Sequence, residues 1–154
     1  MPNFDALFGA DLRLLGGLLT AEQRDRGSDL FVALRPASLQ VDLQRLSGVE
    51  NLQQALLLRF LTQRGDLAHL GHPTYGSRLH ELVGELNTET VRNRAKLFAL
   101  QALQEEPRLA AVASIVVATD RARPTVIEIK ASVVTVHDPT PVNLVFGVDL
   151  AGAA

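Results

Sequence analysis

The spacing of apolar residues changes at Pro107, and this change most constrains the fold. Before Pro107 the apolar residues recur at helical intervals. After it, "VIEIKASVV" places Ile127, Ile129, Ala131 and Val133 on one side of an extended chain and polar residues on the other. The segments "AVASIVVAT" and "VNLVFGVDL" also favour strands, so we expect an antiparallel meander. Helices segregated from strands indicate an α+β fold, with three helices packed on a mainly antiparallel sheet formed largely by the C-terminal half.

Three helices are expected before the sheet. Ser47 and Glu50 match a capping box, and Gly65 offers a left-handed stop, so the first helix is expected between them. Ser77 is placed to cap a second, shorter helix. Its apolar positions follow the i, i+3, i+4, i+7 spacing: Leu79, Leu82, Val83 and Leu86. The third and longest helix covers residues 88–104 and ends because Pro107 disfavours helical torsions in the residue before it.

The N-terminal third carries weaker patterns. A short helix is predicted around residues 10–19, ended by Gly16 and Gly17. Leu39, Val41 and Leu43 alternate with polar residues, which predicts a half-buried strand or hairpin. We therefore divide the chain into an N-terminal extension (residues 1–28), a single domain (residues 29–150) and a frayed tail (residues 151–154).

Composition and charge exclude several classes of protein. Lys and Arg number 15 against 17 Asp and Glu, and the arginines are scattered, so a nucleic-acid partner is not expected. The chain has no cysteine, which excludes disulfides and thiolate zinc sites. No apolar run approaches the roughly 20 residues of a membrane span, and the first residues lack the basic segment of a secretory signal. We expect no membrane insertion and a cytoplasmic location.

The segment "GHPTYGSRLHEL" holds a dense set of reactive residue types. Ser77 and His80 would share a helical face, but no G-x-S-x-G elbow is present, and a capping serine uses its oxygen on backbone amides. His69, His72 and His80 match no zinc-binding spacing. We therefore predict no catalytic, cofactor-binding or metal-ligating residue, and no cofactor.

Two further interpretations of this segment stay open. Glu81 and Glu85 would lie one helical turn apart and could act as the paired carboxylates of a glycoside hydrolase, which is the enzymatic alternative. The chain has no tryptophan and one tyrosine to stack on a sugar, which weighs against it. The structural interpretation is a specified turn formed by Pro73, Tyr75, Gly76 and Ser77.

A second cluster lies at the junction between the longest helix and the first strand. Glu106 and Arg108 flank the rigid Pro107, so a carboxylate and a five-donor guanidinium are presented in a nearly fixed geometry. The junction could lock onto a neighbouring chain. It could equally form a local ion pair at the surface, which contributes only about 0–1 kcal/mol.

The segments "ENLQQALLLRFLTQRGDL", "GHPTYGSRLHEL" and "ALQEEPRL", in this order and before a β-rich end, resemble the baseplate wedge or sheath-initiator family of contractile tails. This family, also called tail-lysozyme-like, includes the W baseplate protein of contractile phages, with members in extracellular contractile injection systems and type VI secretion machines. The resemblance covers residues 49–150. Residues before about position 29 lie outside it.

The resemblance implies a small structural subunit, without enzyme activity, in a hetero-oligomeric ring around the tail tube. It would join wedge proteins to the first sheath ring, with the sheath protein and other wedge subunits as partners and tube or hub proteins as further candidates. It would assemble in the cytoplasm and remain in the baseplate of the particle. The implied contact residues are Glu106, Pro107 and Arg108. The implied pairing strands lie in residues 126–136 and 142–150, with Val142, Leu144, Phe146 and Val148 as partner-binding residues.

Overall fold

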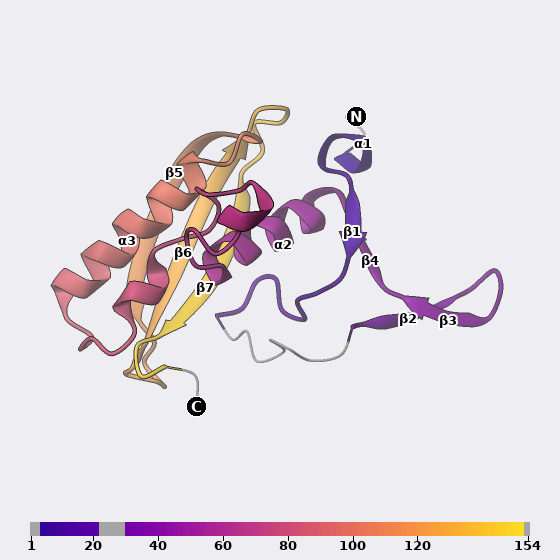
Figure 1. The fold of residues 1–154 in the computed structure, drawn as a ribbon. Coiled ribbons are helices and arrows are strands. Elements are labelled where there is room, and N and C mark those ends of the chain that lie inside the picture. Colours follow the sequence, from indigo (N-terminus) through magenta and orange to yellow (C-terminus); the bar gives the residue numbers. More distant parts are fainter. Residues whose placement is uncertain (1–3, 22–29, 153–154) are drawn as a thin grey trace.

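The computed structural model describes residues 4–21 and 30–152 (Figure 1). The proposed extension and tail fall partly outside these residues, because positions 1–3, 22–29 and 153–154 are not described. The elements in chain order are α1 (Phe4–Phe8), β1 (Ala10–Leu12), β2 (Val32–Arg35), β3 (Gln40–Leu43), β4 (Arg45–Ser47), α2 (Gly48–Leu61), the 3-10 helices η1 (Ala68–Leu70) and η2 (Leu79–Leu82), α3 (Glu89–Gln104), β5 (Leu109–Thr119), β6 (Val126–Thr135) and β7 (Val142–Asp149).

The C-terminal half forms the predicted antiparallel meander. Its strands lie in the order β5-β6-β7, so β6 is central. Ile129 pairs with Phe146 and Ala131 pairs with Leu144, which keeps the alternating apolar residues of adjacent strands on one face. The opposite face carries polar groups, including an ion pair of 2.7 Å between Glu128 and Lys130. The predicted α+β class is confirmed.

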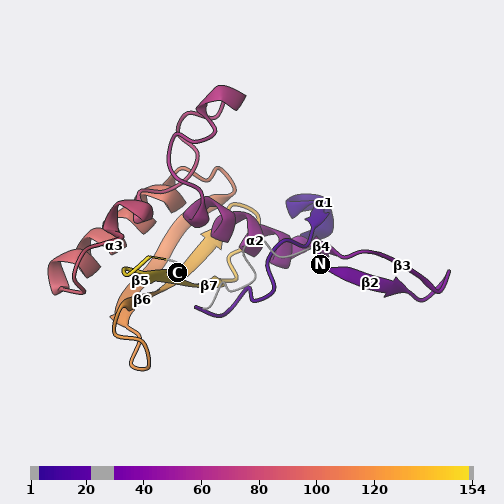
Figure 2. The ribbon, with the colours of Figure 1, turned by 60° about the horizontal axis from the view of Figure 1, so that its bottom comes forward.

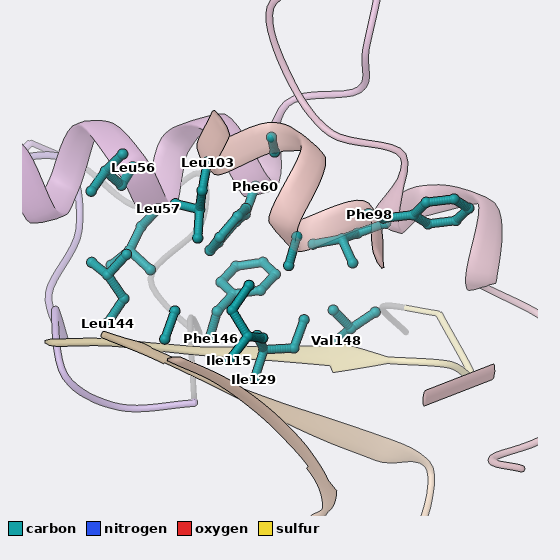
Figure 3. Close-up of a cluster of buried hydrophobic side chains, with 14 of the residues drawn as sticks. Leu56, Leu57, Phe60, Phe98, Leu103, Ile115, Ile129, Leu144, Phe146 and Val148 are labelled. Atoms are coloured by element: carbon teal, nitrogen blue, oxygen red, sulfur yellow. The ribbon is translucent and has the colours of Figure 1, made fainter. Parts of the chain in front are cut away.

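Helices α2 and α3 cover the apolar face of this sheet, and together they make a two-layer structure (Figures 1 and 2). Leu56 and Phe60 from α2 and Leu103 from α3 point toward the strands (Figure 3). The Phe60 and Phe146 rings lie 5.4 Å apart between their centroids. Because each fully buried large apolar side chain contributes about 1.5–3 kcal/mol, this layer contact is the main source of stability.

The longest helix agrees with its prediction. Thr88 is its N-cap, and the Thr88 side chain accepts a hydrogen bond from the Val91 amide. The helix ends at Gln104, three residues before Pro107. Its buried positions include Val91, Ala95 and Phe98 at helical spacing, which directs one face onto the sheet.

The predicted second helix is wrong. Only Leu79–Leu82 is helical, as a 3-10 turn, and Leu86 is 82% exposed. The chain leaves the turn at Gly84, whose φ of 92° is unfavourable for other residues and whose amide donates to the Leu150 carbonyl. This tertiary hydrogen bond draws the chain to the end of β7 instead of continuing the helix.

The predicted helix over residues 10–19 is also wrong. Ala10–Leu12 is strand β1, which pairs antiparallel with β4, and the short helix α1 precedes it. β2 and β3 form the expected hairpin, but its strands are exposed and not half-buried, and Leu39 lies in the turn with a φ of 55°. The hairpin projects away from the helices and the main sheet (Figure 1).

Helix α2 begins where the capping box predicts, but Ser47 makes no capping hydrogen bond through its side chain. The helix ends at Leu61, where the Thr62 hydroxyl donates to the Leu58 carbonyl, and Gly65 lies beyond this end. No helix in the described part of the chain is both long enough and apolar enough to cross a membrane.

Candidate assembly interface

The Glu106-Pro107-Arg108 junction connects α3 to β5 through a tight turn. The Glu106 amide donates to the Leu103 carbonyl, and the Leu109 amide donates to the Glu106 carbonyl, at 3.1 Å each. The Arg108 carbonyl accepts a hydrogen bond of 3.0 Å from the Val136 amide, just beyond the end of β6. The junction is therefore fixed at both ends by backbone bonds and determines where β5 begins.

The Glu106 carboxylate is buried between two guanidinium groups. Arg59 Nη2 donates to Glu106 Oε2 at 3.1 Å, and Arg108 Nε donates to Glu106 Oε1 at 2.6 Å. Burial alone would raise the pKa of Glu106, but the hydrogen bond and charge of Arg108 and the charge of Arg59 outweigh it, so the pKa lies below its ordinary value. The carboxylate is ionised at neutral pH and holds two cations from different elements together.

Arg59 was missed by the sequence reasoning. It lies on α2, is 7% exposed, and reaches Glu106 47 residues along the chain. Its guanidinium carbon lies 4.5 Å from the centroid of the Tyr75 ring, a cation–π contact. The sequence feature that could have revealed Arg59 is its position inside the apolar run "LLLRFL". An arginine in such a run is expected to be buried, and a buried arginine requires an acidic partner.

The predicted turn lies directly beside this network. Tyr75 is half-buried under Arg59, and burial raises its pKa above the usual value. Gly76 has a φ of 104°, and an added Cβ would lie 2.7 Å from the Thr62 carbonyl oxygen. Pro73 is exposed. The turn therefore needs glycine at position 76 and packs a tyrosine against the buried arginine.

Ser77 has a second role besides the predicted helix cap. Its hydroxyl donates to the Phe60 carbonyl at 2.8 Å, near the end of α2. Its amide also donates to the Thr62 carbonyl, and its own carbonyl accepts from the Arg64 amide. Ser77 fastens the loop to α2 through these hydrogen bonds, and its hydroxyl oxygen also accepts a bond of 3.4 Å from the Leu79 amide at the start of η2.

The sheet has two edges, and they differ in what covers them. β6 pairs with β5 on one side and β7 on the other, so the expectation that residues 126–136 pair with another chain is wrong. At the β7 edge, the Gln53 side chain donates to the Asn143 carbonyl at 2.9 Å. An added Cβ on Gly147 would lie 2.2 Å from the Ala21 carbonyl oxygen. α2 thus occupies part of this edge, and Ala21 lies against the face of β7 that is opposite the core.

The four predicted partner-binding side chains of β7 face the protein's own core. They are at most 7% exposed: Val142, Leu144, Phe146 and Val148. They pack beneath the helices, so another chain could meet this strand only through its backbone. Their contact with a partner stays a prediction.

The β5 edge is open, since no strand pairs with its outer side in the described part of the chain. The strand has 11 residues, "LAAVASIVVAT", with no charged residue and no proline. Charged side chains and proline are the usual guards against pairing at an exposed edge. Val116 is 58% exposed on this strand. β5 therefore begins immediately after the Glu106-Pro107-Arg108 junction and lacks charged and proline guards, although its pairing with β6 shifts register twice between Leu109 and Ser114.

The two candidate hydrolytic carboxylates, Glu81 and Glu85, are each paired with an arginine. Arg78 donates two hydrogen bonds to Glu81, at 2.7 and 2.9 Å, and these bonds hold the pKa of Glu81 below its usual value. Glu85 pairs with Arg94 at 2.5 Å, and the two glutamates do not share a helix. Residues 4–21 and 30–152 hold no group of three or more His, Asp or Glu side chains arranged to bind a metal.

Comparison with known proteins shows the fold. No protein-family model matches the chain, and no curated protein is significantly similar to it. Among solved structures, the fold is similar to that of a Geobacter sulfurreducens protein provisionally named a tail lysozyme. The TM-score is 0.59 at 22% identity, over 71% of this chain and 97% of that one. At this identity the likeness establishes the α+β architecture that the two chains share.

Proposed function

We propose that this chain is a structural subunit of the baseplate of a contractile tail or injection machine. In this role it links wedge proteins around the tube to the first sheath ring and templates sheath assembly by strand pairing. The observation that carries the proposal is the position of the open β5 edge, directly after a junction locked by Arg59, Glu106 and Arg108. The fold likeness to a protein provisionally named a tail lysozyme supports the assignment to a tail.

The physical basis is the unsatisfied backbone of β5. An exposed strand edge offers N–H and C=O groups that an extended segment of another chain can complete, and alternating side chains set the register. The buried ion pairs fix the direction in which β5 leaves the helices. A ring of such subunits would therefore present strand edges in one defined orientation, from which sheath polymerisation could start.

Arg108→Ala tests the junction directly. Arg108 is 30% exposed at its side chain, whereas Glu106 keeps its buried partner Arg59 in the variant. We expect the isolated chain to remain folded, judged by circular dichroism, while particles assembled with the variant lose their sheath in electron micrographs. Normally sheathed particles carrying the variant would contradict the proposed role of the junction.

The alternative function is a glycoside hydrolase acting on peptidoglycan, which Glu81 and Glu85 would serve. A general acid in such an enzyme needs a raised pKa, whereas the pKa of Glu81 is lowered by Arg78. We therefore expect the purified chain to leave peptidoglycan intact from about pH 4 to 8, a range that spans the raised pKa of about 6 of a glycosidase general acid. Clearing by the wild-type chain that is lost in Glu81→Gln would favour the enzyme instead.

A further inference from the structure

The hairpin of β2 and β3 carries an apolar face that is largely open within the described part of the chain. Cross-strand pairing sets Val32 against Leu43 and Leu34 against Val41, so these four side chains share one face. They are 40–68% exposed. We call this face the apolar ribbon. An isolated two-stranded hairpin is only marginally stable in water, so a ribbon of this kind gains stability when another surface covers it.

The charge next to the ribbon restricts what can cover it. Arg45 follows Leu43 by two residues and begins β4, so it lies at the base of the hairpin next to the ribbon. Arg45 is exposed and forms no ion pair within the described residues. A matching surface therefore needs an apolar floor with an anionic group at its margin.

Such a surface exists elsewhere on the same molecule. A hollow of about 490 Å³ lies between α1, the start of α2 and the connection from β6 to β7. Its apolar walls are Phe8, Leu19, Val49, Pro141 and Val142. Leu19 is 58% exposed in this wall. Its volume falls within the range of about 300–1,000 Å³ that is typical of binding pockets.

The margin of the hollow supplies the anionic group. Asp138 lines it, together with Thr140. Hydrogen bonds from Thr140 to the Asp138 carboxylate hold the pKa of Asp138 below its usual value. The carboxylate is therefore ionised at neutral pH and can attract a cation on an incoming chain.

The β2–β3 hairpin projects away from the main sheet in both views, so the ribbon does not fill the hollow of its own chain (Figures 1 and 2). We propose that the apolar ribbon of one copy inserts into the hollow of a second copy, with Arg45 of the first near Asp138 of the second. This contact joins two different surfaces, so repetition builds a ring or an open chain of copies. It does not depend on the proposed function and requires no sheath.

Area favours this arrangement over two ribbons packed face to face. Full burial of an aliphatic side chain contributes about 1.5–3 kcal/mol. At about 25 cal/mol per Å², this energy corresponds to roughly 60–120 Å² of apolar surface removed from water. Four side chains fall well short of the roughly 800 Å² per partner of a stable interface. When the ribbon enters the hollow, the walls and margin of the hollow are buried as well. Each copy inside a chain or ring makes this contact twice, once through its ribbon and once through its hollow.

The absence of cysteine allows a clean cross-linking test on the full chain. Val41→Cys and Thr140→Cys are prepared separately, mixed, and treated with a short thiol cross-linker. We expect a covalent pair that contains one copy of each variant, identified by mass spectrometry, and little product from either variant alone. Equal linking of Val41→Cys with itself would show ribbon-to-ribbon packing and overturn the proposal. Absence of any mixed product would also overturn it.

Charge reversal provides the matched control. Adding Arg45→Glu to the Val41→Cys copy should lower the mixed product at least about tenfold, because two acidic groups then meet. Adding Asp138→Arg to the Thr140→Cys copy should restore it. Failure of restoration would contradict the Arg45–Asp138 contact. Circular dichroism of each variant checks that the fold is retained.

Discussion

Replacing Glu106 with alanine is expected to lower the free energy of unfolding by about 3–5 kcal/mol, the cost of removing one partner from a buried ion pair. Arg59, which is 7% exposed, would keep its charge without a carboxylate, and Arg108 would lose its hydrogen bond of 2.6 Å. Urea denaturation followed by circular dichroism measures the change.

The neighbouring residue offers a matched control. Glu105 pairs with Arg64 at 2.8 Å, but both side chains are about one third exposed. Solvent screening limits such a pair to about 0–1 kcal/mol, so Glu105→Ala should change the free energy of unfolding little. Similar losses in the two variants would contradict the structural role that we assign to Glu106.

The same carboxylate predicts how stability depends on pH. The folded-state pKa of Glu106 is lowered, so its contribution is fully present above the unfolded-state value of about 4.3 and is lost as pH falls through the lower folded-state pKa. The difference in unfolding free energy between wild type and Glu106→Ala should therefore be largest near neutral pH and shrink below about pH 4. A difference that grows on acidification would show the opposite sign of shift.

Placing lysines on the β5 edge should abolish partner-strand pairing. The double variant Ser114→Lys, Ala118→Lys introduces two charges on exposed positions opposite Ser132 and Glu128, where β6 can accommodate them. Edge lysines oppose the approach of another strand, because their charges would lose water on pairing. We expect at least about tenfold fewer sheathed particles, a change that corresponds to about 1.4 kcal/mol.

The control carries the same added charge away from the edge. Ala122→Lys, Thr125→Lys places two lysines in the exposed connection between β5 and β6. Particles with this control should assemble normally. Equal defects in both variants would attribute the loss to net charge and not to the β5 edge.

The elements with long, regular patterns were predictable from the sequence. The alternation of apolar and polar residues from Ile127 to Val133 defined β6, and the spacing of Val91, Ala95 and Phe98 defined α3, because each pattern repeats over several turns or pairs. The middle helix failed because its pattern rested on four positions, two of which, Val83 and Leu86, are exposed. So few buried positions do not hold the chain in a helix, because the Gly84 amide donates a hydrogen bond to the Leu150 carbonyl instead.

The candidate site was predictable only in part. The Glu106-Pro107-Arg108 junction could be found because its residues are adjacent, whereas Arg59 could not be assigned to it because the contact spans 47 residues. The choice of sheet edge also depends on tertiary structure. Sequence alone favoured β7, but the Gln53 side chain hydrogen-bonds to the β7 backbone, and β5 is the edge left open in the described part of the chain.

The most direct test of the assembly role is the structure of this chain inside a purified particle, determined by electron cryo-microscopy. The proposal predicts a strand from a neighbouring protein hydrogen-bonded along β5, with Arg108 at the contact and the Arg59–Glu106 pair intact. A particle in which β5 faces solvent while the chain is held by other surfaces would contradict it.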